Sequence, residues 1–128
     1  MNRIRTAAIQ MCAGGSKNEN LKTALSQIDL TVDRFGPLDL IVLPEYCYGE
    51  PTPSTVGELA ESLPGPFSEA MQEKAQQHKV NLVTGSFAEA APDGRAYNTT
   101  LIFNREGSLL GSYRKVHLME GLAFHESE

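Results

Sequence analysis

The sequence predicts an α/β fold, and three consecutive segments at its start carry the prediction. Residues 3–12 have the composition of a first strand, which Gly14-Gly15 breaks. Residues 16–35 then carry apolar side chains at helical spacing, and in the segment 39–43 every residue after the first is apolar. A strand, a helix and a second strand in this order predict two parallel strands joined by a right-handed crossover.

Both ends of the helix are marked in the sequence. Ser16 and Glu19 have the spacing of a capping box, in which each side chain bonds the other residue's backbone N–H. Gly36-Pro37 ends the helix, because glycine readily leaves the helical conformation and proline cannot continue it. Between these ends, one apolar face predicts contact with a core: Leu21, Ala24, Leu25, Ile28, Val32 and Phe35.

The second strand runs directly into a proline and a carboxylate. Four consecutive apolar residues, 40–43, predict a strand that is buried on both faces. Pro44 lacks a backbone N–H and ends the strand, which places Glu45 just past its carboxyl end. Open α/β sheets bind ligands at this edge, so Glu45 is a candidate functional carboxylate. The alternative is that Glu45 begins a solvated loop, as loop carboxylates commonly do.

A long loop and a second helix follow this strand. Residues 46–66 predict a proline-rich loop with one short helix near 56–62. A loop of this length inside a compact domain is usually functional or covers something. Gly65-Pro66 opens the second helix, 66–78, which has one apolar face. We expect His78, at its carboxyl end, to complement the helix dipole.

The last part of the chain is rich in β-structure. Residues 80–87 predict a third buried strand, in which Gly85 marks a bulge or a close approach of another backbone. Residues 96–104 and 108–116 predict a β-hairpin whose turn is 105–107.

One residue of this hairpin is a candidate for function. Side-chain alternation puts Leu109, Tyr113 and Lys115 on one face of the second arm and Arg114 on the other. A lysine in a strand is most often an edge or surface residue. Its apolar neighbours on the same face leave partial burial of Lys115 as the alternative.

Composition and charge bound the class of protein. The chain has 128 residues, 41% of them apolar, and therefore predicts one soluble domain. The net charge of −5 argues against nucleic-acid and anionic-membrane partners. No apolar run is long enough to span a membrane, and the first residues lack the apolar stretch of a signal peptide, so we expect a cytoplasmic protein.

The sequence contains no recognisable metal or nucleotide motif. Cys12 and Cys47 have no metal-type spacing and are expected to be buried free thiols. His78, His117 and His125 form no ligand motif with them. Because Gly-x-Gly-x-x-Gly and phosphate-loop patterns are also absent from the sequence, no metal or organic cofactor is expected.

Several short motifs, taken in order, resemble a known family. The chain is similar to the N-terminal half of the carbon–nitrogen hydrolase (nitrilase-type amidase) superfamily, and the similarity runs along the whole chain. The motifs that carry it are Ala8-Ile9-Gln10-Met11, Leu43-Pro44-Glu45, Gly85-Ser86-Phe87-Ala88-Glu89, Tyr97-Asn98-Thr99, Tyr113-Arg114-Lys115-Val116-His117-Leu118 and Phe124-His125-Glu126-Ser127.

The resemblance implies a fold and a set of site residues. The fold is a four-layer α-β-β-α sandwich of two mixed sheets, usually in a dimer or larger homo-oligomer. The family's site is a Glu–Lys–Cys triad with a second glutamate, and it hydrolyses a small amide, nitrile or carbamoyl compound through a thioester. By matching motifs, Glu45 falls on the general base and Lys115 on the oxyanion-stabilising lysine. Glu126 falls on the supporting glutamate, after a loop whose length varies within the family.

Elementary chemistry fits these roles. A cysteine attacks as the thiolate, so it needs a base such as Glu45 to take its proton. Burial at the end of an apolar strand is expected to raise the pKa of Glu45. A cationic Lys115 would stabilise the charge that develops on the substrate oxygen or nitrogen.

The family's nucleophilic cysteine has no counterpart among residues 1–128. It follows the second glutamate by a few tens of residues, whereas Cys12 and Cys47 match no nucleophile motif and are expected to be structural. Three interpretations follow: an inactive fragment of a hydrolase, a non-catalytic binding or assembly module with the half-fold, or an independent α/β ligand-binding domain. We favour the fragment, and expect it to be poorly soluble because a halved sandwich exposes sheet edges and an apolar sheet face.

Overall fold

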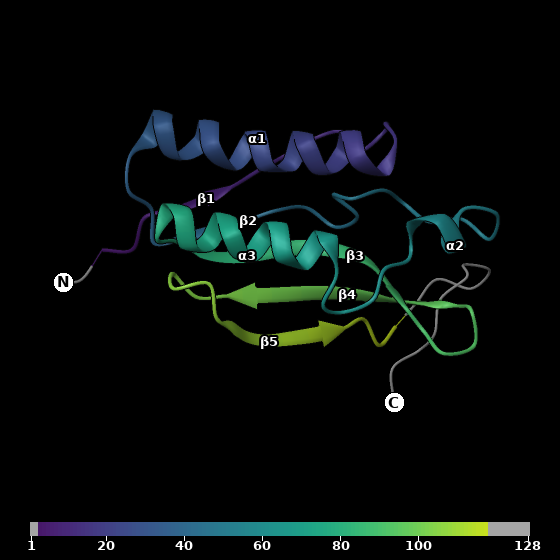
Figure 1. Ribbon diagram of the computed structural model, residues 1–128. Coiled ribbons are helices and arrows are strands. Elements are labelled where there is room, and N and C mark those ends of the chain that lie inside the picture. The colour runs from purple at the N-terminus through teal and green to yellow at the C-terminus, as the bar shows by residue number, and fades with distance from the viewer. Residues whose placement is uncertain (1–2, 118–128) are drawn as a thin grey trace.

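In the computed structural model, which describes residues 3–117, five strands form a single sheet in the order of the sequence (Figure 1). No helix in this described part is long and apolar enough to cross a membrane. The strands are β1 (Thr6–Ala8), β2 (Leu40–Val42), β3 (Asn81–Ala90), β4 (Ala96–Phe103) and β5 (Leu109–Arg114).

Strand direction decides which residues meet at each end of the sheet. β1, β2 and β3 are parallel, and β4 runs antiparallel to both β3 and β5. β5 therefore points the same way as β2, although β3 and β4 lie between them (Figure 1). As a consequence, the chain leaves β2 and β5 at the same end of the sheet. The predicted α/β fold with a parallel β1–β2 pair is confirmed.

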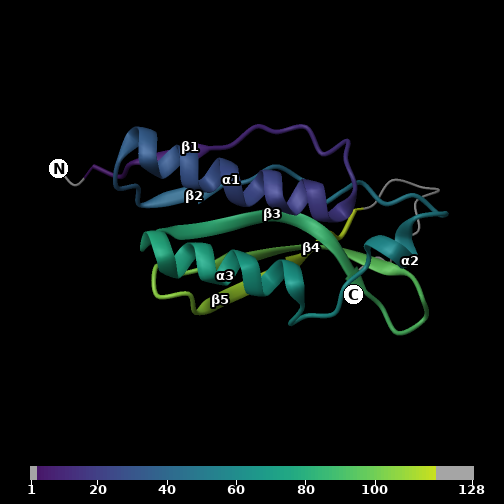
Figure 2. The same ribbon diagram turned by 45° about the horizontal axis from the view of Figure 1, so that its top comes forward.

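Two long helices cover one face of the sheet. These are α1 (Lys17–Phe35) and α3 (Pro66–His78), which lie side by side on that face (Figure 2). The predicted capping box is present, since Ser16 N donates to Glu19 Oε2 at 2.9 Å and Glu19 N donates to Ser16 Oγ at 3.4 Å. The core between helices and sheet includes Ala24, Ile28, Ile41, Phe67, Met71, Leu82 and Leu101. Each of the large side chains in this set contributes roughly 1.5 to 3 kcal/mol on burial.

The two helices are also joined by charged side chains. Asp29 of α1 accepts hydrogen bonds from Lys74 Nζ, at 2.7 Å to both oxygens, and its Oδ1 lies 2.7 Å from His78 Nε2. Burial pushes the pKa of Asp29 upward, but the hydrogen bonds and charges of Lys74 and His78 outweigh it and lower the pKa. His78 thus has a specific partner on α1 in addition to its place at the end of α3.

The opposite face of the sheet is open in residues 3–117, and this corrects one prediction. The apolar run of β2 was expected to be buried on both faces, but only Ile41 and Leu43 are buried, whereas Leu40 and Val42 are half-buried. The physical reason is that both long helices pack on the same face. Ile102 of β4 and Tyr113 of β5 are likewise exposed, at 38% and 57%.

The first strand is shorter than predicted. Residues 3–12 were expected to form it, but β1 ends at Ala8, and one further hydrogen bond joins Ile9 N to Val42 O at 2.9 Å. Its partner β2 is only three residues long, so little backbone is available for pairing. Cys12 lies beyond the strand and is exposed, which corrects the expectation of a buried thiol.

The proline-rich loop contains the short helix that was predicted, as α2 (Val56–Leu59). The segment after it pairs with the end of β3, since Glu61 N donates to Ala88 O and Ala90 N donates to Glu61 O. The Glu61 carboxylate is buried there. Its Oε1 accepts from Tyr48 Oη at 2.5 Å and from Lys17 Nζ at 2.8 Å, and its Oε2 accepts from the amide of Phe67 at 2.9 Å.

The hairpin of β4 and β5 forms as predicted. Asn104 closes its turn by accepting hydrogen bonds on Oδ1 from the amides of Glu106 and Ser108. Gly107 supplies the positive φ of 79° that the turn requires. The predicted irregularity at Gly85 is also present, as a shift in the β3–β4 register between Val83 and Ser86.

Candidate active site

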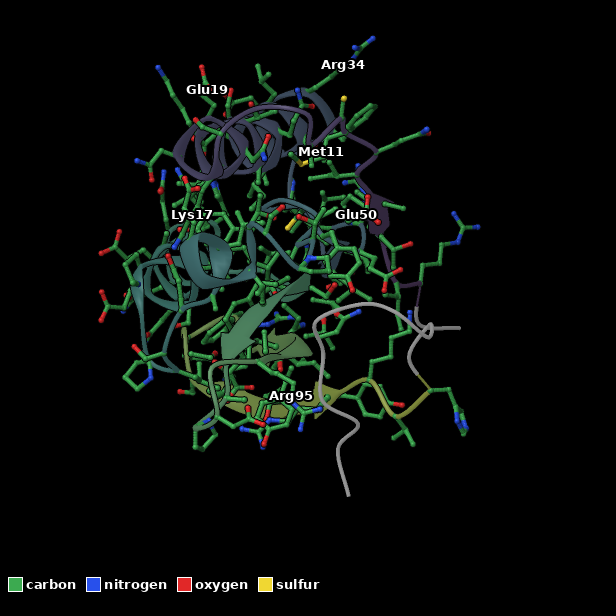
Figure 3. All side chains as sticks on the ribbon, turned by 90° about the vertical axis from the view of Figure 1, so that its right-hand side faces the viewer. Met11, Lys17, Glu19, Arg34, Glu50 and Arg95 are labelled. Atoms are coloured by element: carbon green, nitrogen blue, oxygen red, sulfur yellow. The ribbon has the colours of Figure 1, made fainter. Side chains whose placement is uncertain are left out.

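The end of the sheet reached by β2 and β5 brings Glu45 and Lys115 together. Glu45 follows β2 by three residues, and Lys115 directly follows β5. Lys115 Nζ lies 3.0 Å from Glu45 Oε1, although the two residues are 70 positions apart in the sequence. Their side chains are 41% and 52% exposed. Figure 3 views the molecule from this end, on which Lys17 and Glu50 also lie.

A close backbone contact fixes where the chain turns into Glu45. Gly85 of β3 has φ +68°, and a Cβ added there would lie 2.0 Å from the carbonyl oxygen of Pro44. Only glycine combines this conformation with so close an approach. The bulge in β3 therefore packs directly against Pro44, the residue that precedes Glu45.

The residue after Glu45 is held in an unusual conformation. Tyr46 has φ +54°, which is uncommon for a residue with a side chain, and its amide donates to Ser86 Oγ at 3.0 Å. Its hydroxyl accepts a hydrogen bond from Asn98 Nδ2 at 3.0 Å. Surrounding contacts from β3 and β4 thus support a backbone conformation that is costly by itself.

Asn98 of β4 is the third side chain at the site. Its Nδ2 donates to Glu45 Oε1 at 2.8 Å, on the same oxygen that Lys115 contacts. Asn98 is almost fully buried, at 3% exposure. The site is therefore built from the loop after β2, the first part of β4 and the residue that follows β5.

The electrostatics of Glu45 differ from the sequence-based expectation. The hydrogen bond from Lys115 lowers its pKa, partial burial opposes this, and the hydrogen bond from Asn98 and the charge of Lys115 lower it further. The net direction is downward, whereas desolvation was expected to raise the pKa. The expectation was wrong because, in the described part of the chain, about half of the Glu45 side chain is exposed. Two donors, Lys115 and Asn98, also stabilise its charged form.

A pocket of about 390 Å³ opens beside this pair. Besides Glu45 and Lys115, its walls come from three strands and include Val83, Ser86, Asn98, Thr100 and Tyr113. Lys115 and Tyr113 share this pocket, as the predicted alternation requires. A larger hollow of about 560 Å³ lies between β1 and α1, but its lining contains Arg5 as the sole charged residue and neither Glu45 nor Lys115.

Neither cysteine of the chain is placed as a nucleophile for Glu45. Cys47 is fully buried, and its Sγ lies within hydrogen-bond distance of the Thr84 carbonyl oxygen, at 3.2 Å. Burial raises the pKa of Cys47 to about 12, so the thiol is protonated at neutral pH. Cys12 is exposed in the loop after β1. Glu126 and His125 lie outside the described residues.

Metal ligands do not gather at this site. Within residues 3–117, no three His, Cys, Asp or Glu side chains are placed as they would be around a metal ion. The charges that face each other here are those of Glu45 and Lys115.

A second carboxylate, Glu89 at the end of β3, anchors the strand that carries Lys115. Both of its oxygens accept hydrogen bonds from Arg114, at 3.0 and 2.6 Å, and Oε2 also accepts from Thr99 Oγ1 at 2.7 Å. The Arg114 guanidinium stacks on the ring of Tyr97 at 4.0 Å. Burial raises the pKa of Glu89, but the bonds from Arg114 and Thr99 outweigh it and lower the pKa.

Sequence reasoning assigned no individual role to Asn98, Ser86 or Glu89. All three lie in motifs that carry the family resemblance, but a side chain's hydrogen-bond partners cannot be read from a motif. A polar residue at an inward position of an otherwise apolar strand was the available signal, because a buried polar group requires a partner.

Comparison with known proteins matches the chain over most of its length. The family profile described as Carbon-nitrogen hydrolase matches residues 5–128. Nitrilase homolog 2 of Dictyostelium discoideum is 34% identical over 132 residues, which cover 98% of this chain and 39% of that protein. Omega-amidase NIT2 of Mus musculus is 32% identical over 121 residues, which cover 94% of this chain and 42% of that protein. The chain thus spans less than half the length of these relatives.

Solved structures show the same fold. Saccharomyces cerevisiae Nit3, described as a member of branch 10 of the nitrilase superfamily, superposes with a TM-score of 0.84 at 27% identity, over 98% of this chain and 49% of that one. A carbon–nitrogen hydrolase from Helicobacter pylori gives a TM-score of 0.82 at 21% identity, over 98% and 45% of the two chains. This second likeness concerns the fold alone.

Proposed function

This chain belongs to the carbon–nitrogen hydrolase family, and we propose that it supplies the general base and the oxyanion-stabilising lysine of a hydrolase for small amide, nitrile or carbamoyl compounds. The resemblance to the N-terminal portion of such a protein is confirmed, as is the predicted fold class. Omega-amidases among the relatives favour an amide as the substrate. The observation that carries the proposal is the 3.0 Å contact between Glu45 and Lys115 beside an open pocket.

In the proposed reaction, Glu45 takes the proton of a cysteine thiol, and the thiolate attacks the substrate carbon. The lowered pKa of Glu45 keeps it ionised at neutral pH, which it must be in order to accept that proton. Lys115 Nζ stabilises the negative charge that develops on the substrate heteroatom. Glu45 returns the proton to the leaving amine, then activates the water that hydrolyses the thioester. Glu126 is proposed as the carboxylate that supports Lys115.

In this proposal, neither cysteine of residues 1–128 is the nucleophile. Cys47 is buried and bonded to a backbone carbonyl, and the family motif assigns no catalytic role to Cys12. The 128-residue chain alone is therefore proposed to be inactive, as an incomplete hydrolase domain. The open sheet face supports this, because in a four-layer sandwich a second sheet covers it.

A fusion protein tests the proposal directly. Residues 1–128 are joined to the part of yeast Nit3 that this chain does not match, and hydrolysis of small amides is measured. We expect turnover from the fusion, none from the 128-residue chain, and retained turnover in the fusion carrying Cys47→Ser. Turnover by the 128-residue chain that Cys47→Ala abolishes would contradict the assignment of the nucleophile.

The half-exposed apolar sheet face also favours a second candidate, a non-catalytic binding or assembly module. Leu40, Val42 and Ile102 on that face could contact a partner instead of a second sheet. A monodisperse, cooperatively unfolding 128-residue monomer would favour this module. Self-association or poor solubility would favour the incomplete hydrolase. A homo-oligomeric state and a cytoplasmic location belong to the hydrolase proposal.

A further inference from the structure

Asn98 connects to both candidate catalytic residues, through different groups. Its side-chain Nδ2 donates to Glu45 Oε1 at 2.8 Å, and its main-chain carbonyl accepts a hydrogen bond from the amide of Lys115 at 2.8 Å. The residue lies in β4, between β3, which contacts the residue before Glu45, and β5, which Lys115 directly follows. A single buried residue is therefore hydrogen-bonded both to the proposed base and to the proposed lysine.

Both hydrogens of the Asn98 side-chain NH₂ group are used in hydrogen bonds. An amide NH₂ group has two hydrogens, and Nδ2 has two acceptors, Glu45 Oε1 and the Tyr46 hydroxyl at 3.0 Å. Because Asn98 is only 3% exposed, water competes poorly for either bond. The Asn98 NH₂ group thus bridges the Glu45 carboxylate and the hydroxyl of Tyr46, the next residue.

The two oxygens of Glu45 are treated differently. Oε1 accepts from both Asn98 Nδ2 and Lys115 Nζ. Within residues 3–117, Oε2 accepts no hydrogen bond. A carboxylate whose first oxygen is occupied by two donors offers its second oxygen to an incoming proton.

We propose that Asn98 is a positioning residue that fixes Glu45 through Oε1, so that Oε2 is the oxygen that accepts the proton from the attacking group. The inference rests on the proposed function, because it assigns an atom of the same base. The proton leaves the attacking thiol or water and forms the O–H bond at Oε2, and the electron pair stays on the attacking atom. Oε1 keeps its two donors throughout.

Loss of the Asn98 donor is expected to change the pKa of Glu45, which a loss of packing alone would not do. A hydrogen bond to the ionised carboxylate favours that form, so its removal raises the pKa of Glu45. The other groups that act on Glu45 within the described part of the chain are Lys115, which remains, and Tyr46, whose own pKa burial and the Glu45 charge raise to about 12. The Tyr46 hydroxyl therefore stays protonated in the pH range in which a carboxylate titrates.

The test follows the pH titration of Glu45 and of the Asn98 side-chain amide by NMR in the yeast Nit3 fusion. In the unaltered protein, we expect the Asn98 amide protons to shift with the titration of Glu45. The amide of Asn81 provides the matched control, because it donates to the Asp39 carbonyl at the other end of the sheet and should not follow that titration. An Asn98 amide that ignores the Glu45 titration would overturn the proposal without any variant.

Variants give the second readout. Asn98→Leu keeps a similar volume without a donor and is expected to raise the Glu45 midpoint, whereas Asn81→Leu is expected to leave it unchanged. An unchanged midpoint in a folded Asn98→Leu protein contradicts the assignment. These measurements do not depend on hydrolysis. An inactive fusion that shows the expected titrations would contradict the proposed function alone. An active fusion in which the Asn98 amide does not shift with the titration of Glu45 would contradict the positioning role alone.

Discussion

Two glutamates of this molecule, Glu45 and Glu61, lie close to the same strand but in opposite surroundings. Glu45 follows β2, Glu61 follows the helix α2, and both lie near the same end of β3. Glu61 is 6% exposed, and both of its oxygens are bonded, to Tyr48, Lys17 and the first turn of α3. Glu45 is 52% exposed and is bonded through one oxygen only within the described residues.

The difference separates a structural carboxylate from a reactive one. A buried carboxylate with both oxygens bonded stabilises the elements that it joins, and its burial keeps a substrate from reaching it. A carboxylate held at one oxygen is oriented and still able to accept a proton. Exposure of the side chain and bonding of each oxygen therefore distinguish the two roles.

The largest expected effect is on catalysis by the yeast Nit3 fusion. Glu45→Gln keeps the shape and removes the base, so turnover should fall by roughly 10² to 10⁴-fold, the usual contribution of general acid–base catalysis. Steady-state amide hydrolysis measures it. Glu61→Gln is the matched control and should lose less activity per folded molecule. Equal losses would erase the distinction between the two carboxylates.

A large effect on stability is expected from the other carboxylate. Glu61→Ala leaves the Tyr48 hydroxyl and the Phe67 amide without their acceptor in a buried site, and removes the carboxylate partner of Lys17. The free energy of unfolding should fall by about 3 kcal/mol. Urea denaturation of the chain measures it, with the exposed Glu58→Ala on α2 expected to change stability by less than about 0.5 kcal/mol. Comparable losses from both variants would show that the buried cluster is not stabilising.

A smaller effect on stability is expected from acid, through Glu89. Its folded-state pKa lies below the ordinary 4.5, so its bonds stabilise the fold above that pH and are lost as the pH falls toward the folded-state value. Glu89→Gln removes this dependence. Between pH 6 and 3 the unaltered chain should lose roughly 1 kcal/mol more stability than Glu89→Gln, as measured by urea denaturation at each pH. Parallel pH profiles would contradict the assignment.

The smallest effect is expected from Glu45 itself on stability. Its ion pair with Lys115 is about half exposed, and pairs of this kind contribute about 1 kcal/mol or less. Glu45→Gln and Lys115→Met should therefore both unfold within about 1 kcal/mol of the unaltered chain. A loss as large as that of Glu61→Ala would make Glu45 a structural carboxylate as well.

Much of the fold follows from local chemistry that the sequence displays. The capping box at Ser16, the hairpin closed at Gly107 and the bulge at Gly85 were each predicted from residue types with narrow conformational requirements, and each is present. The prediction of a raised pKa for Glu45 was wrong. It treated the end of a buried strand as a dry environment and omitted donors that come from β4 and β5.

The sequence by itself determined where the strands and helices form and that a carboxylate follows β2, because turns, caps and apolar periodicity act over a few residues. Only the tertiary structure decided which side chains meet that carboxylate. Strand order and direction bring Asn98 and Lys115 to Glu45 across 53 and 70 positions, while both helices pack on one face and leave the other open. Contacts at such separations depend on the register of four strands at once, and no local pattern encodes that register.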